Sequence, residues 1–221
     1  MASATSDPSL SAYAPSTFDH SSSTTTYTPP SSLAPSSSTT PTFTFPTYAL
    51  FPPFYTLQPN LTTRARQLEL WSTLITSYST YHRLFRLSLS SLPPDLFTSS
   101  TVHRSLKPAD VRTVLDYMSL PSNGSRVEWI APTTRGESSS ACYVYWKSLG
   151  EWADEIYGWV DETGQKGAVL TVYELRESDA VRGKAWRDMD EGMLRKVLGV
   201  LVKRGKAQVF GVEESAGVKF F

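Results

Sequence analysis

Apolar side chains recur at three- and four-residue steps along several stretches of the chain, and this spacing predicts amphipathic helices. In the first stretch, residues 62–82, the apolar positions include Leu68, Trp71 and Ile75. Proline at position 108 suits the first turn of a later helix. Further helices are predicted at 97–106, 108–118, 148–164 and 188–205.

Short segments of alternating or β-branched apolar residues lie between these helices and predict strands. Ser148 and Glu151 have the spacing of a capping box, in which serine accepts from the backbone and glutamate reaches back to it. We therefore expect a helix to begin just after Ser148. The predicted strands are residues 81–89, 127–130, 142–146, 169–175, 207–210 and 217–221.

The same order of elements occurs twice along the chain. A helix, a short apolar strand, a polar loop and an aromatic strand occupy about 108–146 and return at about 188–221, an offset of roughly 80 residues. Each half then has three helices finished by a β-hairpin, which is the plan of a winged helix. The predicted fold class is α+β and mostly helical, with tandem winged-helix domains at 61–146 and 147–221. A single α+β domain is the alternative.

Residues 43–60 combine large aromatic side chains with prolines. Because proline fixes φ near −65° and biases its predecessor toward extended conformations, we expect neither a helix nor a central strand here. The rings must lie in grooves, either on the chain's own domain or on another protein, and the pattern alone leaves both possibilities open. The aromatic residues are Phe43, Phe45, Tyr48, Phe51, Phe54 and Tyr55, and the prolines are Pro46, Pro52, Pro53 and Pro59.

The first 42 residues differ from the rest in composition. Residues 1–44 contain 23 Ser or Thr and no Lys or Arg, so they have too little apolar surface to offset the entropy of ordering. We expect residues 1–42 to be disordered. The absence of a basic start and of a long apolar run argues against a signal peptide, a transit peptide and a membrane span. The expectation is a cytoplasmic protein.

No group of residues has the spacing of a catalytic, metal or cofactor site. The three histidines are scattered at His20, His82 and His103, and one cysteine cannot complete a zinc site. The lone Cys142 lies among aromatic residues and is expected to be a small buried apolar side chain. Asp154, Glu155, Asp161 and Glu162 are interpreted as a solvated helix face. The chain is therefore predicted not to be an enzyme and to need no cofactor.

Winged helices often bind DNA, but the charges here argue against it. The formal net charge is zero, which leaves little counterion release to drive binding. The helix predicted to enter the major groove in the second half begins with Asp188, Asp190 and Glu191, whose carboxylates would face phosphate. We therefore expect no nucleic-acid partner, and a DNA-binding regulator is kept as an alternative.

Several motifs together resemble the vacuolar protein sorting-associated protein 25 family, the small subunit of the endosomal sorting complex ESCRT-II. The resemblance runs from about Phe45 to Phe221 in consistent order. The motifs are Phe51-Pro52-Pro53-Phe54-Tyr55 with Gln58-Pro59-Asn60 and Thr63-Arg64, Leu68 with Trp71, Tyr145-Trp146-Lys147-Ser148-Leu149 with Trp152, Leu170 to Leu175, and Gly217 to Phe221.

The resemblance implies a role in protein sorting into multivesicular bodies. Two copies of such a subunit join two larger ESCRT-II subunits in a heterotetramer, and Pro-Pro-x-Tyr-like motifs dock in hydrophobic pockets of those partners. The C-terminal winged helix recruits and activates an ESCRT-III subunit, and contact with the endosomal membrane is only indirect, through the complex. The docking residues implied for this chain are Pro46, Tyr48, Phe51, Pro52, Pro53, Phe54 and Tyr55.

Two expectations about contact surfaces follow. Replacing both Phe54 and Tyr55 by alanine is expected to leave the fold intact and to release the larger subunits. Trp186, Arg195 and Lys196 are possible surface contacts of the second domain, although packing and solvation explain them equally well. A ligand of WW domains, recognised through residues 50–60 alone, is a further alternative.

Overall fold

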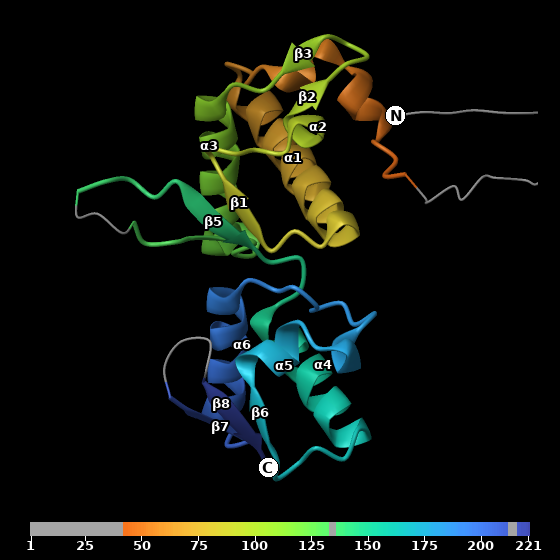
Figure 1. The fold of residues 1–221 in the computed structure, drawn as a ribbon. Helices are drawn as coiled ribbons and strands as arrows, with labels where there is room; N and C mark the ends of the chain where they lie inside the picture. The colour runs from red at the N-terminus through yellow and green to blue at the C-terminus, as the bar shows by residue number, and fades with distance from the viewer. Residues whose placement is uncertain (1–41, 133–135, 212–215) are drawn as a thin grey trace, which may run out of the picture. The chain divides into compact units, whose positions relative to one another are not determined.

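The computed structural model describes residues 42–132, 136–211 and 216–221, which belong to one compact unit (Figure 1). The tail predicted to be disordered, residues 1–42, lies outside the described residues except for Thr42. Among the helices of the described ranges, none is both long and apolar enough to cross a bilayer. The protein is a mixture of helices and sheets.

The N-terminal half, residues 61–146, is built on two long helices, α1 and α3, and a three-stranded antiparallel sheet, with a short helix and a two-stranded hairpin between them. The sheet has the order β1-β5-β4, so the last strand of the half lies between the other two. The elements are α1 (Leu61–His82), β1 (Arg86–Ser88), α2 (Pro94–Phe97), β2 (Thr98–Ser99), β3 (Arg104–Ser105), α3 (Pro108–Ser119), the 3-10 turn η3 (Pro121–Asn123), β4 (Val127–Trp129) and β5 (Ala141–Val144).

The C-terminal half, residues 147–221, repeats this arrangement. Its sheet has the order β6-β8-β7, again with the last strand in the middle. The elements are α4 (Leu149–Glu162), β6 (Val169–Thr171), α5 (Val172–Arg176), the 3-10 turn η4 (Asp179–Val181), α6 (Glu191–Lys203), β7 (Ala207–Phe210) and β8 (Gly217–Phe220). The order helix, strand, short helix, long helix, strand, strand is therefore present twice.

Two predicted boundaries agree closely with the structure. The helix predicted over residues 62–82 is α1, whose first turn is capped by the Asn60 side chain accepting from the Thr63 backbone N–H. The capping box predicted at Ser148 and Glu151 is confirmed at the start of α4, with both reciprocal hydrogen bonds present.

Two predicted elements were wrong in part. Residues 97–106 do not form a helix, because α2 ends at Phe97 and the hairpin β2–β3 follows, reversing near His103, whose φ is +50°. The strand predicted over residues 169–175 stops at Thr171. The Thr171 hydroxyl accepts from the Glu174 N–H and the Glu174 carboxylate accepts from the Thr171 N–H, so a capping box starts a helix within the β-branched run.

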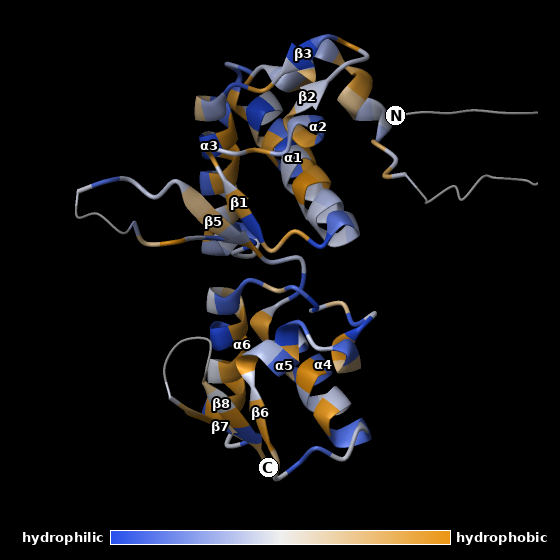
Figure 2. Ribbon diagram, in the orientation of Figure 1, coloured by the Kyte–Doolittle hydropathy of each residue, from blue (hydrophilic) through white to orange (hydrophobic). Residues whose placement is uncertain are grey.

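Each half has its own cluster of buried apolar side chains. The first centres on α1 and α3 and contains Trp71 and Met118; the second centres on α4 and α6 and contains Trp152 and Leu198. Figure 2 shows apolar and polar residues alternating around α4 and α6, as expected for helices with one buried face.

Strand β5 contributes to both clusters because successive side chains of a strand point to opposite faces. Cys142 and Val144 belong to the first cluster, whereas Tyr143 and the following Tyr145 belong to the second. All four residues of β5 are buried. The sheet of the N-terminal half is thus packed on both sides.

Polar contacts join the same region to α6. The Tyr145 hydroxyl donates to Glu128 Oε2 at 2.7 Å, and Lys196 Nζ donates to Glu128 Oε1 at 2.5 Å. Burial opposes ionisation of Glu128, but the hydrogen bonds from Lys196 and Tyr145 outweigh it and lower the pKa of the carboxyl group. Burial raises the pKa of Tyr145, and the neighbouring Glu128 carboxylate raises it further.

These contacts predict a pH-dependent contribution of Glu128 to stability. With its pKa lowered in the folded state, the contribution is complete above the ordinary glutamate pKa of about 4.3 and is lost as pH falls through the folded-state value. Glu128→Gln should therefore lower the free energy of unfolding at pH 7, by under about 1 kcal/mol because the pair is partly exposed. Urea unfolding as a function of pH measures this. The gap to wild type should narrow as pH falls below the ordinary glutamate pKa. Glu137→Gln, at an exposed loop residue, is the control and should change little at any pH. An equal loss at every pH would contradict the assignment.

Candidate protein-binding site

The aromatic arm, residues 43–60, folds into two consecutive 3-10 turns. These are η1 (Thr47–Leu50) and η2 (Pro52–Tyr55), joined by Phe51 in an extended conformation with φ −95° and ψ 110°. The expectation that no part of this segment is helical was therefore wrong for residues 47–55. The proline φ that excludes a central strand also suits the first turn of a helix, and Pro52 and Pro53 occupy that position in η2.

Two of the arm's rings are buried in the chain's own N-terminal half. Phe54 and Tyr55 are each only 4% exposed. The Phe54 ring stacks on Trp71 with centroids 4.3 Å apart and an interplanar angle of 11°, and the Tyr55 hydroxyl donates to the Ala49 carbonyl at 3.1 Å. Both rings belong to the first hydrophobic cluster, so we now expect their removal to destabilise the fold as well as any docking.

Buried polar groups on α1 fix the arm in place. Gln67, only 5% exposed, donates through Nε2 to the backbone oxygens of Phe54 at 2.8 Å and Thr56 at 2.9 Å. The Trp71 indole N–H also donates to the Phe54 oxygen, at 3.1 Å. These bonds satisfy carbonyls that the short 3-10 turns leave unpaired. The arm is consequently a fixed part of the N-terminal half.

The other side of the arm faces solvent. Phe51 is 62% exposed and Leu50 is 54% exposed, and Pro52 and Pro53 are also exposed. We call these four residues, 50–53, the arm ridge. Tyr48 and Pro46 are half-buried. Exposed apolar groups held on a rigid turn can bury surface against a partner with little loss of conformational entropy, so the arm ridge is the candidate binding site.

The structure thus divides the predicted docking residues into two groups. Phe51, Pro52 and Pro53 are exposed to solvent, whereas Phe54 and Tyr55 are buried beneath them in the N-terminal half. Leu50 joins the displayed group, although its position beside the motif was not singled out from the sequence. Gln67 was also missed; a single glutamine among the apolar positions of an amphipathic helix is the signal that would have indicated it.

The tyrosine hydroxyls of the arm act as neutral hydrogen-bond donors. Burial raises the pKa of Tyr48, and it raises that of Tyr55 against a smaller opposing effect of a hydrogen bond with Ser99. The Tyr48 hydroxyl donates to the Leu70 carbonyl at 3.3 Å, which adds a further hydrogen bond between the arm and α1.

The conformation of the arm disfavours the alternative that the chain is a ligand of WW domains. A tyrosine buried in a 3-10 turn does not present the extended polyproline conformation that WW domains recognise.

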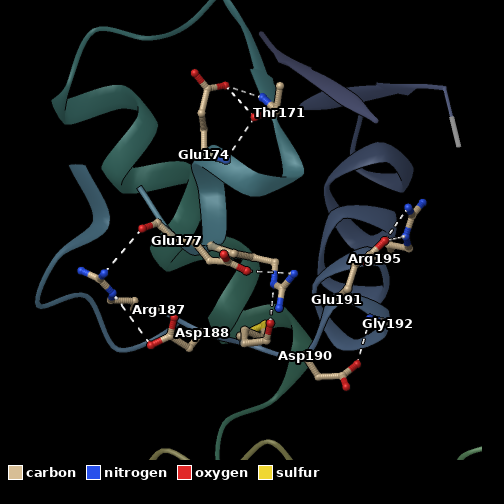
Figure 3. Close-up of polar contacts among 11 residues, drawn as sticks. Thr171, Glu174, Glu177, Arg187, Asp188, Asp190, Glu191, Gly192 and Arg195 are labelled. Atoms are coloured by element: carbon tan, nitrogen blue, oxygen red, sulfur yellow. Dashed lines mark hydrogen bonds and ion pairs between the residues drawn. The ribbon is translucent and has the colours of Figure 1, made fainter. Parts of the chain in front are cut away.

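The possible contacts of the C-terminal half lie in different environments. Trp186 is only 3% exposed and its indole N–H donates to the Leu175 carbonyl, so it is a core residue. Arg195 pairs with Glu191 one turn earlier on α6 at 2.6 Å (Figure 3), and Lys196 pairs with Glu128. Trp186 is therefore corrected from a possible surface contact to a packing residue.

The residues leading into α6 are held by local polar contacts, as Figure 3 shows. Arg187 interacts with Asp188 and with the Glu177 backbone oxygen, and Asp190 caps the helix by accepting from the Gly192 N–H. At the other end of α6, Arg204 pairs with Asp154 at 2.7 Å. Because much of the basic charge of α6 is already neutralised by carboxylates, the helix is poorly suited to phosphate contacts.

The described ranges offer little for metal or nucleophile chemistry. Within them, no group of three or more His, Cys, Asp or Glu side chains is placed to hold a metal ion. The expectation that Cys142 is buried is confirmed: it is 0% exposed, and burial raises the pKa of its thiol to about 12. A thiol in this state is a poor nucleophile.

The family model for "ESCRT-II complex subunit" matches residues 48–190, a range that begins inside the arm and continues into the C-terminal half. The vacuolar protein-sorting-associated protein 25 of Xenopus laevis is 36% identical over 180 residues, which cover 81% of this chain and 99% of the relative. The chain belongs to the vacuolar protein-sorting-associated protein 25 family.

Other members of the family match this chain over nearly their whole length. The human and Dictyostelium discoideum proteins of the same name are each 32% identical to this chain, covering 81% of it and 98% and 96% of their own lengths. The crystal structure of subunit VPS25 of the endosomal trafficking complex ESCRT-II matches with a TM-score of 0.68 and 27% identity, over 80% of this chain and 98% of that one.

Two structures of whole ESCRT-II also contain a similar chain. The crystal structure of endosomal complex ESCRT-II (VPS22/VPS25/VPS36) matches with a TM-score of 0.68 and 25% identity, and the structure of the ESCRT-II endosomal trafficking complex with a TM-score of 0.69 and 26% identity. Each covers 79% of this chain and 98% of the other. This VPS25-family chain is thus an ESCRT-II subunit in endosomal sorting.

Proposed function

We propose that this chain is a non-enzymatic assembly and adaptor subunit whose arm ridge docks on the larger ESCRT-II subunits. The observation that carries the proposal is the exposure of Leu50 and Phe51 on a rigid turn whose underside is locked to α1. Family membership supports it, since the family match includes the arm from Tyr48 onward. Pro52 and Pro53 complete the ridge, and Pro46 and Tyr48 flank it.

The finer architecture belongs to the same proposal. Each half, 61–146 and 147–221, is a winged helix, and the arm at 43–60 precedes the first of them. The repeated element order and the matching strand orders β1-β5-β4 and β6-β8-β7 support this description. The two-residue hairpin β2–β3 is an addition within the N-terminal half.

The proposed assembly rests on membership of the family. Two copies of this chain join one copy each of the two larger subunits, and the C-terminal half recruits and activates an ESCRT-III subunit. The complex acts in sorting ubiquitinated cargo into multivesicular bodies, is cytoplasmic, and reaches endosomal membranes peripherally. The presence of VPS22 and VPS36 in the solved complex of a similar chain supports the choice of larger partners.

Truncation of the exposed ring tests the docking. Phe51→Ala should leave stability within about 0.5 kcal/mol of wild type, because surface substitutions away from special features usually have small effects. It should nevertheless reduce co-purification with the co-expressed larger subunits at least tenfold, since burying such a ring contributes roughly 1.5–3 kcal/mol. Quantified bands after affinity capture and gel filtration measure this.

A matched control is Leu120→Ala, which truncates another exposed apolar side chain of the N-terminal half, 48% exposed and outside the arm. It should retain both larger subunits. Equal recovery of the subunits with Phe51→Ala and with wild type would overturn the docking proposal.

A further inference from the structure

A mainly apolar groove runs beside the arm ridge, between the arm and the first turns of α1. It is lined by Tyr48, Phe51, Pro53 and Phe54 from the arm and by Thr63 and Leu70 among the residues of α1. The groove encloses about 360 Å³, which lies within the range of about 300–1,000 Å³ for sites that bind small molecules. It can therefore accept one large side chain.

The walls of the groove are fixed before any partner arrives. Phe54, at its floor, is stacked on Trp71, and the Phe54 carbonyl is held by Gln67 and by the Trp71 indole. Tyr48 is tied to α1 by the bond from its hydroxyl to the Leu70 carbonyl. A preformed groove binds its occupant without an ordering cost in the receptor.

The polar atoms around the groove are already engaged within the chain. The Tyr48 hydroxyl and the Gln67 amide nitrogen donate to backbone carbonyls, and Arg66 at the rim pairs with Glu69 at 2.8 Å. A polar ligand would find few free partners here and would lose its hydration. The lining favours an apolar side chain.

We propose that the groove receives an apolar side chain of the same larger ESCRT-II subunit that binds the arm ridge, so that docking is reciprocal. Phe51 is the link: its ring is part of the exposed ridge and also lines the groove. A partner that covers Phe51 also covers the groove, and an unfilled groove would leave lining atoms without contacts. The inference rests on the proposed docking.

Filling the groove from an exposed position provides the test. Thr63→Trp places a ring at a residue that lines the groove, whereas Thr62→Trp places the same ring on the neighbouring exposed residue, which does not. Affinity for the purified pair of larger subunits is measured by biolayer interferometry. Thr63→Trp should weaken binding at least tenfold, and Thr62→Trp should stay within about twofold of wild type.

A second variant alters the lining of the groove on the α1 side. Leu70→Ala removes apolar lining and should also weaken binding about tenfold, while Ser77→Ala, on an exposed position of the same helix, should not. Thermal unfolding of each variant shows that the fold is retained. One variant fills the groove and the other removes part of its lining, so the conclusion does not depend on a single substitution.

The outcomes separate the groove from the ridge. Weak binding by Phe51→Ala with normal binding by Thr63→Trp and Leu70→Ala would overturn the groove proposal and leave the docking ridge standing. Normal binding by Phe51→Ala with weak binding by both groove variants would overturn the ridge instead. A dimer of the isolated chain that Thr63→Trp dissociates, seen by sedimentation, would make a second copy the occupant and overturn the choice of a larger subunit.

Discussion

Phe54→Ala is expected to lower the free energy of unfolding by about 3–5 kcal/mol, the usual cost of truncating a buried phenylalanine. Phe54 is 4% exposed and stacked on Trp71, so the substitution leaves a cavity between the arm and α1. Since domains are stable by only about 5–15 kcal/mol, this is a large share of the total. Urea unfolding followed by tryptophan fluorescence measures the change.

Phe51→Ala is the matched control, because it removes the same ring three residues earlier from an exposed position. It should unfold at nearly the wild-type urea concentration while losing the larger subunits. The pair separates folding from docking: one phenylalanine stabilises the arm and the other is available to a partner. If both variants unfolded alike, the division of the arm into a buried and a displayed side would be refuted.

Gly192→Ala is expected to destabilise the contact between α6 and β5 by about 1–3 kcal/mol, as overpacking of a filled core does. A Cβ at Gly192 would lie 2.1 Å from the Tyr143 hydroxyl and 3.2 Å from the Cζ atom of its ring. Tyr143 is itself 8% exposed and belongs to the second hydrophobic cluster, so its ring has little room to move. Urea unfolding at pH 7 measures the loss.

Gly199→Ala on the same helix is the control. No atom outside the helix lies within 4 Å of a Cβ built there, so alanine should stabilise α6 by about 0.5–1 kcal/mol through its higher helix propensity. Adding Tyr143→Phe to Gly192→Ala removes the clashing hydroxyl and should restore part of the loss. A Gly192→Ala protein as stable as Gly199→Ala would show that the two elements are not packed as described.

The sequence predicted the main helices well because their apolar periodicity and their capping residues agree. Helix α1 and the capping box at Ser148 follow from these local signals. The 169–175 segment was harder, because β-branched residues favoured a strand while the Thr171–Glu174 pair started a helix. Two local signals of opposite meaning overlapped there, and the capping geometry determined the outcome.

The candidate site was only partly predictable for a different reason. The spacing of prolines and rings identified the arm, but it could not tell which rings face the chain's own helix. That depends on Gln67 and Trp71, which lie more than ten positions away along the chain and hold the Phe54 carbonyl. Which side of a Pro/aromatic turn is displayed is a tertiary property.

Cysteine labelling tests the central claim most directly, since the described ranges contain a single native cysteine, Cys142, and it is buried with a raised pKa. Thr47 is exposed on η1 beside Leu50, and replacing it leaves the four residues of the arm ridge in place. In the free chain, Thr47→Cys should react with a maleimide at a rate close to that of an unfolded thiol, and so should the control Leu120→Cys. In the complex with the larger subunits, Thr47→Cys should be protected at least tenfold and Leu120→Cys should not. Equal labelling of Thr47→Cys in the free chain and in the complex would contradict docking through the arm ridge.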